Sequence, residues 1–447
     1  MAAVKPPPYL LKGVSMFVNY EKLAQIIACF LPNNLQEKVK AWGYQRKISQ
    51  NLSYINKNKI KVLKKLKNKI KKEKLNVAFY VYDEAKWKCQ SLYDLMQESN
   101  FFTPYILATK NSANENSTSF QPKETVQKVF DFFRNKNMQV ILGYDIENEK
   151  FIPTKGVKPC PDIIIYQHPW FVETSQNAVR CSEFALTYYI PYFLPTSISQ
   201  IEYYLRFHQY VENFYVLDES TKELYSNNMQ NKGANLRVVG HPQLDYFYLN
   251  KDTFEDENYV IYAPHWSIDD KTDLKWGTFL WNCEFMLKFA QEHPEYNWVF
   301  KPHPNLKQIL KLRHWSDEKI IEYWNEWKKV GIVHESGDYS DLFLKSKLMI
   351  TDSGSFQTEY FMTQKPCVYL KSENGTSFNS TVQNIVDNYY TVENLTDLET
   401  VLKEVLINNN DYMKIQRLEV FENCKLKGNY AAKNIIDDIL KTLEVEL

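Results

Sequence analysis

The chain has 447 residues, which at roughly 150 residues per domain predicts two or three domains with a sizeable core. Its 44% hydrophobic and 24% charged residues are typical of globular proteins and exclude a disordered or fibrous chain. Because 54 Lys and Arg residues balance 54 Asp and Glu residues, no protein-wide positive field and no nucleic-acid partner are expected. With only 12 glycines, a glycine-rich phosphate loop is not expected either.

The seven cysteines are odd in number and scattered, and no two form a C-x-x-C pair. This pattern disfavours a disulfide framework or a cysteine zinc site and favours a reducing cytoplasm. No apolar run approaches the ~20 residues needed to cross a bilayer. The best candidate, Leu23 to Leu31, is too short and too late for a signal peptide. We therefore expect a cytoplasmic protein that does not span a membrane.

Residues 1–75 are predicted to form a helical, lysine-rich N-terminal extension. A helix is expected over Tyr20–Phe30, and ten of the eighteen residues from 57 to 74 are lysine. Apolar residues recur close to helical spacing in and before this run, at Ile55, Ile60, Leu63, Leu66 and Ile70. One interpretation is a solvated helix with an apolar stripe packed on the body. The other is a cationic helix on anionic lipid, where each basic residue contributes ~1 kcal/mol.

From residue 76 onward, apolar strand-like runs without polar alternation are separated by helical stretches, as in parallel sheets buried on both faces. The first series predicts strands at Val77–Tyr82, Pro104–Ala108, Val140–Tyr144, Asp162–Tyr166, Tyr188–Phe193, Phe214–Leu217 and Leu236–Val239. The second predicts strands at Tyr259–Ala263, Trp298–Lys301, Gly331–His334, Leu348–Thr351 and Cys367–Leu370. These series indicate two doubly wound α/β domains facing a cleft, at 76–245 and 246–447. The last helix, near Asn434–Leu443, either finishes the second domain or crosses back.

Ligands of open α/β sheets bind beyond the carboxyl ends of the strands. The strand ending at Thr351 runs into Asp352-Ser353-Gly354-Ser355 and then into a helix. Small hydroxyl residues at a helix N-terminus form an anion site suited to a pyrophosphate. Glu359, one turn later, is placed to accept hydrogen bonds from a ribose diol. The alternative is an ordinary helix N-cap.

Four of the eight histidines directly follow predicted strands and stand beside proline or one residue from it. Lys301 and His303, in Lys301-Pro302-His303-Pro304, put a cation and an imidazole at a rigid strand exit, where they can stabilise phosphate charge. The other three histidines are His168, His241 and His265. No G-x-G-x-x-G, G-x-x-x-x-G-K-[ST], G-x-S-x-G or H-E-x-x-H motif is present, and no metal site is predicted.

An ordered set of motifs carries a resemblance to a known family. These are Gly-x-Pro-x-x-Asp (240–245), Tyr-Ala-Pro-x-Trp (262–266), Lys-Pro-His-Pro (301–304) and the run from Asp341 to Ser355. Together they resemble the CDP-glycerol glycerophosphotransferase family of teichoic-acid and capsule polymerases and primases, over roughly residues 160–410. The resemblance implies a GT-B-like fold, with the acceptor bound mainly by the first domain and a CDP-linked donor by the second.

The resemblance also implies roles for individual residues. His303 is similar to the donor-side histidine near the pyrophosphate, and His168 stands roughly where the family has the base for the acceptor hydroxyl. The phosphate-binding segment is carried over to Lys301, Thr351, Asp352, Ser353, Gly354 and Ser355, with Glu359 as a ribose partner. Further donor-site candidates are Gly240, His241, Asp245, His265 and Trp266. With these groups stabilising the phosphate charge, no obligatory cofactor or metal is expected.

The implied function is transfer of a polyol phosphate, most simply from CDP-glycerol, to a lipid-linked or glycan acceptor in bacterial surface-polymer synthesis. The family acts peripherally at the inner face of the cell membrane, which favours contact of residues 57–74 with anionic lipid. The segment from Thr351 to Glu359 is also similar to the phosphate loop of UDP-N-acetylglucosamine 2-epimerases. The alternatives are therefore a GT-B nucleotide-sugar glycosyltransferase, an epimerase-like enzyme, or an inactive GT-B scaffold.

Overall fold

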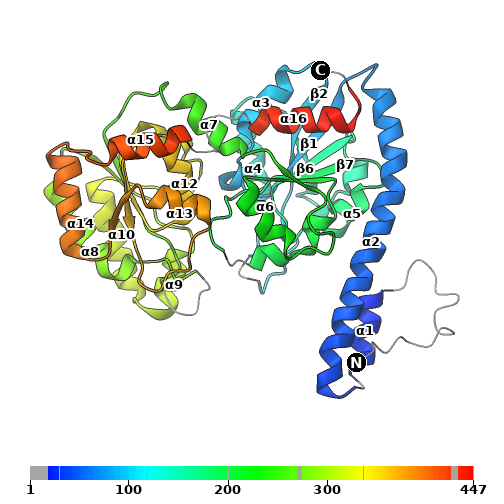
Figure 1. Ribbon diagram of the computed structural model, residues 1–447, viewed down its shortest axis with the longest axis horizontal. Helices are drawn as coiled ribbons and strands as arrows, with labels where there is room; N and C mark the ends of the chain where they lie inside the picture. Colours follow the sequence, from blue (N-terminus) through cyan, green and yellow to red (C-terminus); the bar gives the residue numbers. More distant parts are fainter. Residues whose placement is uncertain are drawn as a thin grey trace.

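The computed structural model describes residues 19–29, 31–117, 119–198, 201–268, 274–335, 337–423 and 431–445. Two α/β domains lie side by side, and a long helix at the N-terminal end runs along the first of them (Figure 1). Each domain has its own parallel sheet, so the predicted architecture of two doubly wound domains with a helical N-terminal extension is confirmed.

The first domain is built on a seven-stranded parallel sheet with the order β3-β2-β1-β6-β7-β8-β9. The strand order reverses between β1 and β6, and ligands of such sheets bind beyond the strands at this switch point. The strands are β1 (Leu75–Val81), β2 (Phe102–Ala108), β3 (Val140–Leu142), β6 (Ile163–Tyr166), β7 (Leu186–Tyr189), β8 (Asn213–Val216) and β9 (Leu236–Val238). A small antiparallel pair, β4 (Tyr144–Asp145) and β5 (Lys150–Phe151), lies outside the sheet.

The second domain has a six-stranded parallel sheet with the order β12-β11-β10-β13-β14-β15 and a switch point between β10 and β13. The strands are β10 (Tyr259–Ala263), β11 (Asn297–Phe300), β12 (Ile332–Val333), β13 (Ser346–Thr351), β14 (Cys367–Leu370) and β15 (Tyr390–Val392). All twelve predicted strands are therefore present, and β15 is an addition that the sequence patterns did not indicate.

Helices cover both faces of each sheet, which explains why the strands are apolar on both sides. Those of the first domain are α3 (Gln90–Glu98), α4 (Glu124–Asn135), α5 (Ala178–Cys181) and α6 (Glu219–Ser226), and α7 (Pro242–Asn250) leads into the second domain. The second domain contains α8 (Phe279–Glu292), α9 (Leu306–Arg313), α10 (Asp317–Val330), α11 (Ser340–Lys345), α12 (Gly354–Phe361), α13 (Ser380–Val386), α14 (Leu395–Leu402) and α15 (Lys414–Asn423).

The lysine-rich segment begins in α2 (Asn33–Lys69), which at 1.5 Å per residue is about 55 Å long, and ends in the turn that follows it. Its C-terminal half packs on the first domain through the predicted stripe, with Ile55 and Leu66 buried and Leu63 and Ile70 partly buried. The prediction is wrong for Ile60, which is 74% exposed. A step of five residues turns a helical side chain by roughly 140°, so Ile60 leaves the stripe that Ile55 begins.

The N-terminal half of α2 pairs with α1 (Tyr20–Ala28), and this hairpin extends beyond the first sheet (Figure 1). Gly43 permits the close approach, since a Cβ there would lie 2.2 Å from the Cβ of Ala24. An ion pair of 2.9 Å between Arg206 and Glu21 ties α1 to the first domain. Within the described residues, no helix combines the length and the apolar character that a membrane crossing requires.

The last helix, α16 (Ala431–Thr442), crosses back to the first domain. Ala432, Ile435 and Ile439 belong to the same core cluster as the apolar residues of β1, β2 and β6. The sequence left open whether this helix finishes the second domain or crosses back, and the structure shows that it crosses back. The chain therefore passes between the domains twice, at α7 and before α16.

Candidate functional site

A cleft of about 550 Å³ lies between the two domains, beyond the carboxyl ends of the central strands of both sheets. The first domain lines it with residues that include Asp83, Lys86, Lys88, Trp170, Tyr192 and Glu202. The second domain contributes residues that include His265, Trp266, Lys301, His303, Ser353, Ser355 and Glu359. The strand exits at the two switch points thus meet in one cavity, where ligands of open α/β sheets bind.

The N-terminus of α12 forms part of the second-domain wall. Ser353 occupies the N-cap position, but its side chain makes no capping hydrogen bond. Ser353 and Ser355 both line the cleft. A helix of this length directs its first N–H groups and the positive end of its dipole outward. Ser353 is therefore not an ordinary side-chain cap, and the anion site at this helix N-terminus stays a prediction.

His303 stands beside this helix at the exit of β11. Its Nδ1 accepts the N–H of Asn305 at 3.1 Å, so the proton of the neutral imidazole lies on Nε2. Burial, the neighbouring His265 and Lys301 hold the pKa of His303 well below 6.5, and Lys86 has the same effect. The ring is therefore neutral at pH 7, with an Nε2–H group that can donate to a phosphate oxygen. The ring of His265 is 5.2 Å away.

Lys301 is almost completely buried, with 6% of its surface exposed. Burial first, and then the charge of Lys88, lower its pKa from 10.5 to about 8. Its Nζ lies 4.7 Å from the ring centre of Tyr339 and 5.4 Å from that of Phe356. An ammonium group held in this way at the cleft wall favours the binding of an anion.

Glu359 lines the cleft, but its carboxylate already has partners. The Tyr339 hydroxyl donates to Oε2 at 2.8 Å, and Lys88 Nζ lies 3.6 Å from Oε1. In this structure the carboxylate therefore takes part in a cluster with residues of both domains. A ribose diol would have to share it with Tyr339 and Lys88.

Thr351 and Asp352 are buried beneath the cleft wall and hold it in place. The Thr351 hydroxyl donates to the Ala263 carbonyl at 2.7 Å. Asp352 accepts the N–H of His265 at 2.6 Å and both the N–H and the hydroxyl of Thr278, at 2.6 and 2.8 Å. Burial raises the pKa of Asp352 to about 6. These contacts join the exits of β10 and β13, so both residues position the site from behind.

Gly354 marks a close approach between the domains. A Cβ at this position would lie 2.8 Å from the hydroxyl oxygen of Thr196, which belongs to the first domain.

His265 and Trp266, two further candidates, line the cleft as expected. The His265 Nδ1 interacts with the Ser267 hydroxyl at 2.7 Å, and burial lowers its pKa to about 3. His265 is therefore neutral.

The remaining donor-site candidates, Gly240, His241 and Asp245, lie outside the cleft, in a separate hollow of about 260 Å³ near the start of α16. His241 caps α7, because its Nδ1 accepts the Gln243 N–H at 3.2 Å, and its Nε2 donates to the Pro191 carbonyl at 2.8 Å. Asp245 accepts the N–H of Ala432 at 2.8 Å. Asp245 thus joins α7 to the start of α16, the two places where the chain passes between the domains. The three residues lie away from the cleft because β9, the strand that precedes them, is at the edge of the first sheet.

His168 follows β6 but is fully buried and is not among the residues that line the cleft. Its ring stacks on Tyr82 with 3.9 Å between centroids, and the ring of Tyr192, which lines the cleft, is 5.1 Å away. Neither ring nitrogen has a hydrogen-bond partner. Burial and Lys86 lower its pKa well below 6.5. The imidazole is thus neutral and separate from the other predicted site residues.

Several cleft residues were not predicted from the sequence, among them Lys86, Lys88, Tyr192, Glu202 and Tyr339. The two lysines follow β1, which ends at Val81 next to the switch point. Applying the strand-exit rule to this strand would have found them. Tyr339 and Glu202 lie in connecting segments without such a signal.

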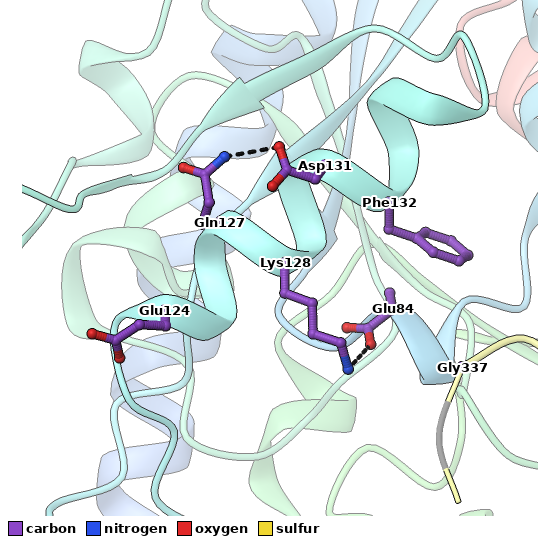
Figure 2. Close-up of a pocket in the computed structure, with 7 residues that line it drawn as sticks. All are labelled: Glu84, Glu124, Gln127, Lys128, Asp131, Phe132 and Gly337. Atoms are coloured by element: carbon purple, nitrogen blue, oxygen red, sulfur yellow. Dashed lines mark hydrogen bonds and ion pairs between the residues drawn. The ribbon is translucent and has the colours of Figure 1, made fainter. Parts of the chain in front are cut away.

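A second hollow, of about 580 Å³, borders α4 and is drawn in Figure 2. Three carboxylates line it, those of Glu84, Glu124 and Asp131, with Lys128 paired to Glu84. This surplus of negative charge opposes the binding of a phosphate-bearing ligand. The interdomain cleft is the better candidate, because three lysines and the N-terminus of α12 accompany its four carboxylates, whereas Lys128 is the one lysine among the described residues that line the hollow beside α4. Within the described residues, no group of three or more His, Cys, Asp or Glu side chains is placed to hold a metal ion.

Comparisons with known proteins agree with this architecture. The wall teichoic acid polymerase TagF, in a variant soaked with CDPG, superposes with a TM-score of 0.53 at 13% identity, covering 96% of this chain and 99% of that one. Another TagF structure gives a TM-score of 0.51 at 13% identity, covering 93% of this chain and 99% of that one. At these identities the likeness establishes the fold, which is GT-B-like.

At the sequence level, a teichoic acid glycerol-phosphate transferase of Staphylococcus aureus is 21% identical over 192 residues. The aligned part is 42% of this chain and 46% of that protein, so the chain spans about half the length of this curated relative. Residues 198–441 match the model of the family described as CDP-Glycerol:Poly(glycerophosphate) glycerophosphotransferase. Since that match covers more than half of the chain and includes the cleft residues of the second domain, the chain belongs to the CDP-glycerol:poly(glycerophosphate) glycerophosphotransferase family.

Proposed function

We propose that the protein transfers a polyol phosphate, glycerol phosphate from CDP-glycerol, to a hydroxyl group of a lipid-linked or glycan acceptor in bacterial surface-polymer synthesis. The observation that carries the proposal is the interdomain cleft, where Lys301, His303 and the N-terminus of α12 surround one cavity. All three stabilise negative charge on phosphate oxygens. The family to which the chain belongs supports the same reaction. The second domain then holds the donor and the first domain the acceptor.

The chemistry is a displacement at phosphorus. The acceptor oxygen forms a bond to the β-phosphorus, the bond from that phosphorus to the oxygen of the α-phosphate breaks, and CMP leaves with the electron pair. Catalysis of such a transfer rests on positioning and on stabilising charge at the phosphate oxygens. The His303 Nε2–H, the Lys301 ammonium and the free N–H groups of α12 supply this stabilisation, so the proposal needs no obligatory metal ion.

We assign removal of the acceptor proton to His168. A neutral imidazole has a lone pair that can accept the proton, and a general base contributes about 10²–10⁴-fold. Burial and Lys86 hold the pKa of His168 well below 6.5 in the free protein, so the ring is neutral but weakly basic until it is exposed to the cleft. Because the ring is buried next to Tyr192, the assignment requires the Tyr192 side chain to turn aside when the acceptor binds.

The donor assignment is tested by the shift in melting temperature with CDP-glycerol, UDP-N-acetylglucosamine and a GDP-sugar. We expect CDP-glycerol to raise the free energy of unfolding most, by about 2.7 kcal/mol at 100 times its Kd, because a ligand that binds only the folded protein stabilises that state. Stabilisation by UDP-sugars alone would favour a nucleotide-sugar enzyme and overturn the proposal. An inactive scaffold predicts no shift with any of the nucleotides.

We further propose that α2 carries the protein to the anionic inner face of the cell membrane. Lys59, Lys65, Lys67 and Lys69 form ion pairs with the body of the protein, at 2.5–3.7 Å. Lys57, Lys61 and Lys64 are exposed and, at spacings of four and three residues, share one helix face. Exposed apolar residues also occur on α1 and at the start of α2, at Leu23, Ile26, Ile27 and Leu35.

Replacing Lys57, Lys61, Lys64 and Lys71 together with glutamine is expected to weaken binding to phosphatidylglycerol vesicles by at least 10-fold at moderate salt. Each basic residue near an anionic surface contributes about 1 kcal/mol, and these four are exposed. Vesicle co-sedimentation measures the effect. The matched control replaces four exposed lysines of the second domain, Lys288, Lys311, Lys328 and Lys403. Equal losses in both variants would contradict a specific role for α2.

A further inference from the structure

The centre of the cleft holds a charged cluster assembled from both domains. Lys88 comes from the first domain, and Lys301, Tyr339 and Glu359 from the second. All four are buried, with exposed fractions between 2% and 8%. Such a cluster is not needed to hold either domain together, because each has a complete apolar core of its own.

Lys88 is held in place at both ends. Its backbone N–H donates to the Gln167 side-chain oxygen at 2.9 Å, which joins the segment after β1 to the one after β6. Its Nζ donates to the Tyr339 hydroxyl and lies 4.2 Å from the centre of that ring and 3.6 Å from Glu359. A long, flexible side chain is thereby fixed across the domain boundary, which lowers the entropic cost of binding a ligand.

The charges of the cluster do not balance. The ammonium groups of Lys88 and Lys301 both lie over the Tyr339 ring, 4.2 and 4.7 Å from its centre, and Lys88 pairs with the one carboxylate of the cluster, that of Glu359. Burial first, and then the neighbouring Lys88 ammonium, lower the pKa of Lys301. Buried charges are stable when they are paired. An anion bound in the cleft would supply the missing pairing, and both lysines already line that cavity.

We propose that Lys88 binds the diphosphate of the donor nucleotide from the first-domain side, opposite Lys301, so that the diphosphate bridges the two domains. The inference rests on the proposed function in taking that anion to be a nucleoside diphosphate. Tyr339 and Glu359 act as positioning residues that orient the Lys88 ammonium. A charge-assisted hydrogen bond of this kind changes affinity by about 10- to 100-fold.

The test is the ratio of the CDP and CMP affinities, measured by titration calorimetry on the full chain. Lys88→Met keeps the length of the side chain and removes the charge. We expect CDP to bind this variant about 10- to 100-fold more weakly, while CMP binding changes less than threefold, because CMP lacks the second phosphate. Lys88→Arg keeps the charge and is expected to retain most of the preference for CDP.

Lys136→Met is the matched control. Lys136 is also a first-domain lysine that pairs with a second-domain carboxylate, Asp338, at 2.9 Å, but it is 38% exposed and is not part of the cleft lining. Breaking this pair removes an interdomain contact of the same kind without removing a predicted phosphate ligand. Both affinities are expected to stay within twofold of the wild-type values.

The outcomes separate the inference from the proposed function. If the wild-type protein binds neither CDP nor CMP, the proposed donor and the inference both fail. If the wild-type protein prefers CDP and Lys88→Met keeps that preference, the inference alone is wrong. Equal losses of CDP and CMP affinity would assign Lys88 a purely structural role and also overturn it. Should Lys88→Met fail to fold, Lys88→Gln removes the same charge, and the same ratio decides.

Discussion

Replacing His303 with alanine is expected to lower the rate of transfer at saturating CDP-glycerol by about 100- to 1,000-fold, the loss typical of one preorganised donor to a developing charge. The reason is the Nε2–H group, which the bond from Asn305 to Nδ1 leaves as the donor of the neutral ring. Release of CMP, measured with excess acceptor, reports the rate.

His303→Gln is expected to retain more activity than His303→Ala, because its amide can still donate a hydrogen bond. His293→Ala serves as a control, since His293 pairs with Glu295 at 3.0 Å and is not part of the cleft lining. Near-wild-type transfer by His303→Ala at saturating donor would remove His303 from the mechanism. An equal loss in the two alanine variants would indicate damage to the second domain instead.

Replacing Lys301 with methionine is expected to weaken CDP binding by about 100-fold and yet to stabilise the free protein. Loss of a buried ammonium that binds a diphosphate removes a strong charge-assisted contact. The same ammonium destabilises the folded chain, because its pKa falls from 10.5 to about 8 on folding. At 1.36 kcal/mol per pKa unit, that cost is about 3 kcal/mol at pH 7.

The sign of the pH dependence follows from proton binding. Between pH 8 and 10.5 the unfolded chain holds the Lys301 proton more tightly than the folded one, so the free energy of unfolding contributed by this group rises with pH. The advantage of Lys301→Met should therefore be largest at pH 7 and shrink towards pH 10. Urea unfolding at both values measures it, with the exposed Lys307→Met as control. A variant less stable than wild type at pH 7 would contradict the assigned cost.

The strands could be predicted from the sequence because parallel strands covered on both faces are continuous apolar runs. β10 (Tyr259–Ala263) and β14 (Cys367–Leu370) have the bounds that their runs predict. β15 (Tyr390–Val392) is only three residues long and was not predicted. Ile60 fits a helical stripe by spacing alone, but its exposure depends on which side of α2 meets the body.

The candidate site was predictable where a strand borders a switch point or is the next strand in the sheet. The exits of β10, β11 and β13 bring His265, His303 and Ser353 to one wall of the cleft. The motif at Gly240 and His241 also follows a strand, but β9 lies at the edge of the first sheet, so it reaches a different hollow. Strand order is a property of long-range pairing, and no local pattern around residue 240 encodes it.

The sequence by itself determined the alternation of strands and helices, the turn at Ser353 that is predicted to bind an anion, and the family resemblance, because each depends on residues close together in the chain. Only the tertiary structure decided which strand exits meet, that α16 returns to the first domain, and that Lys88 lies against Tyr339 and Glu359. Burial decided the rest. It leaves His168 neutral and away from the cleft lining, and it lowers the pKa of Lys301 at the cleft wall, effects that arise from surrounding atoms contributed by distant parts of the chain.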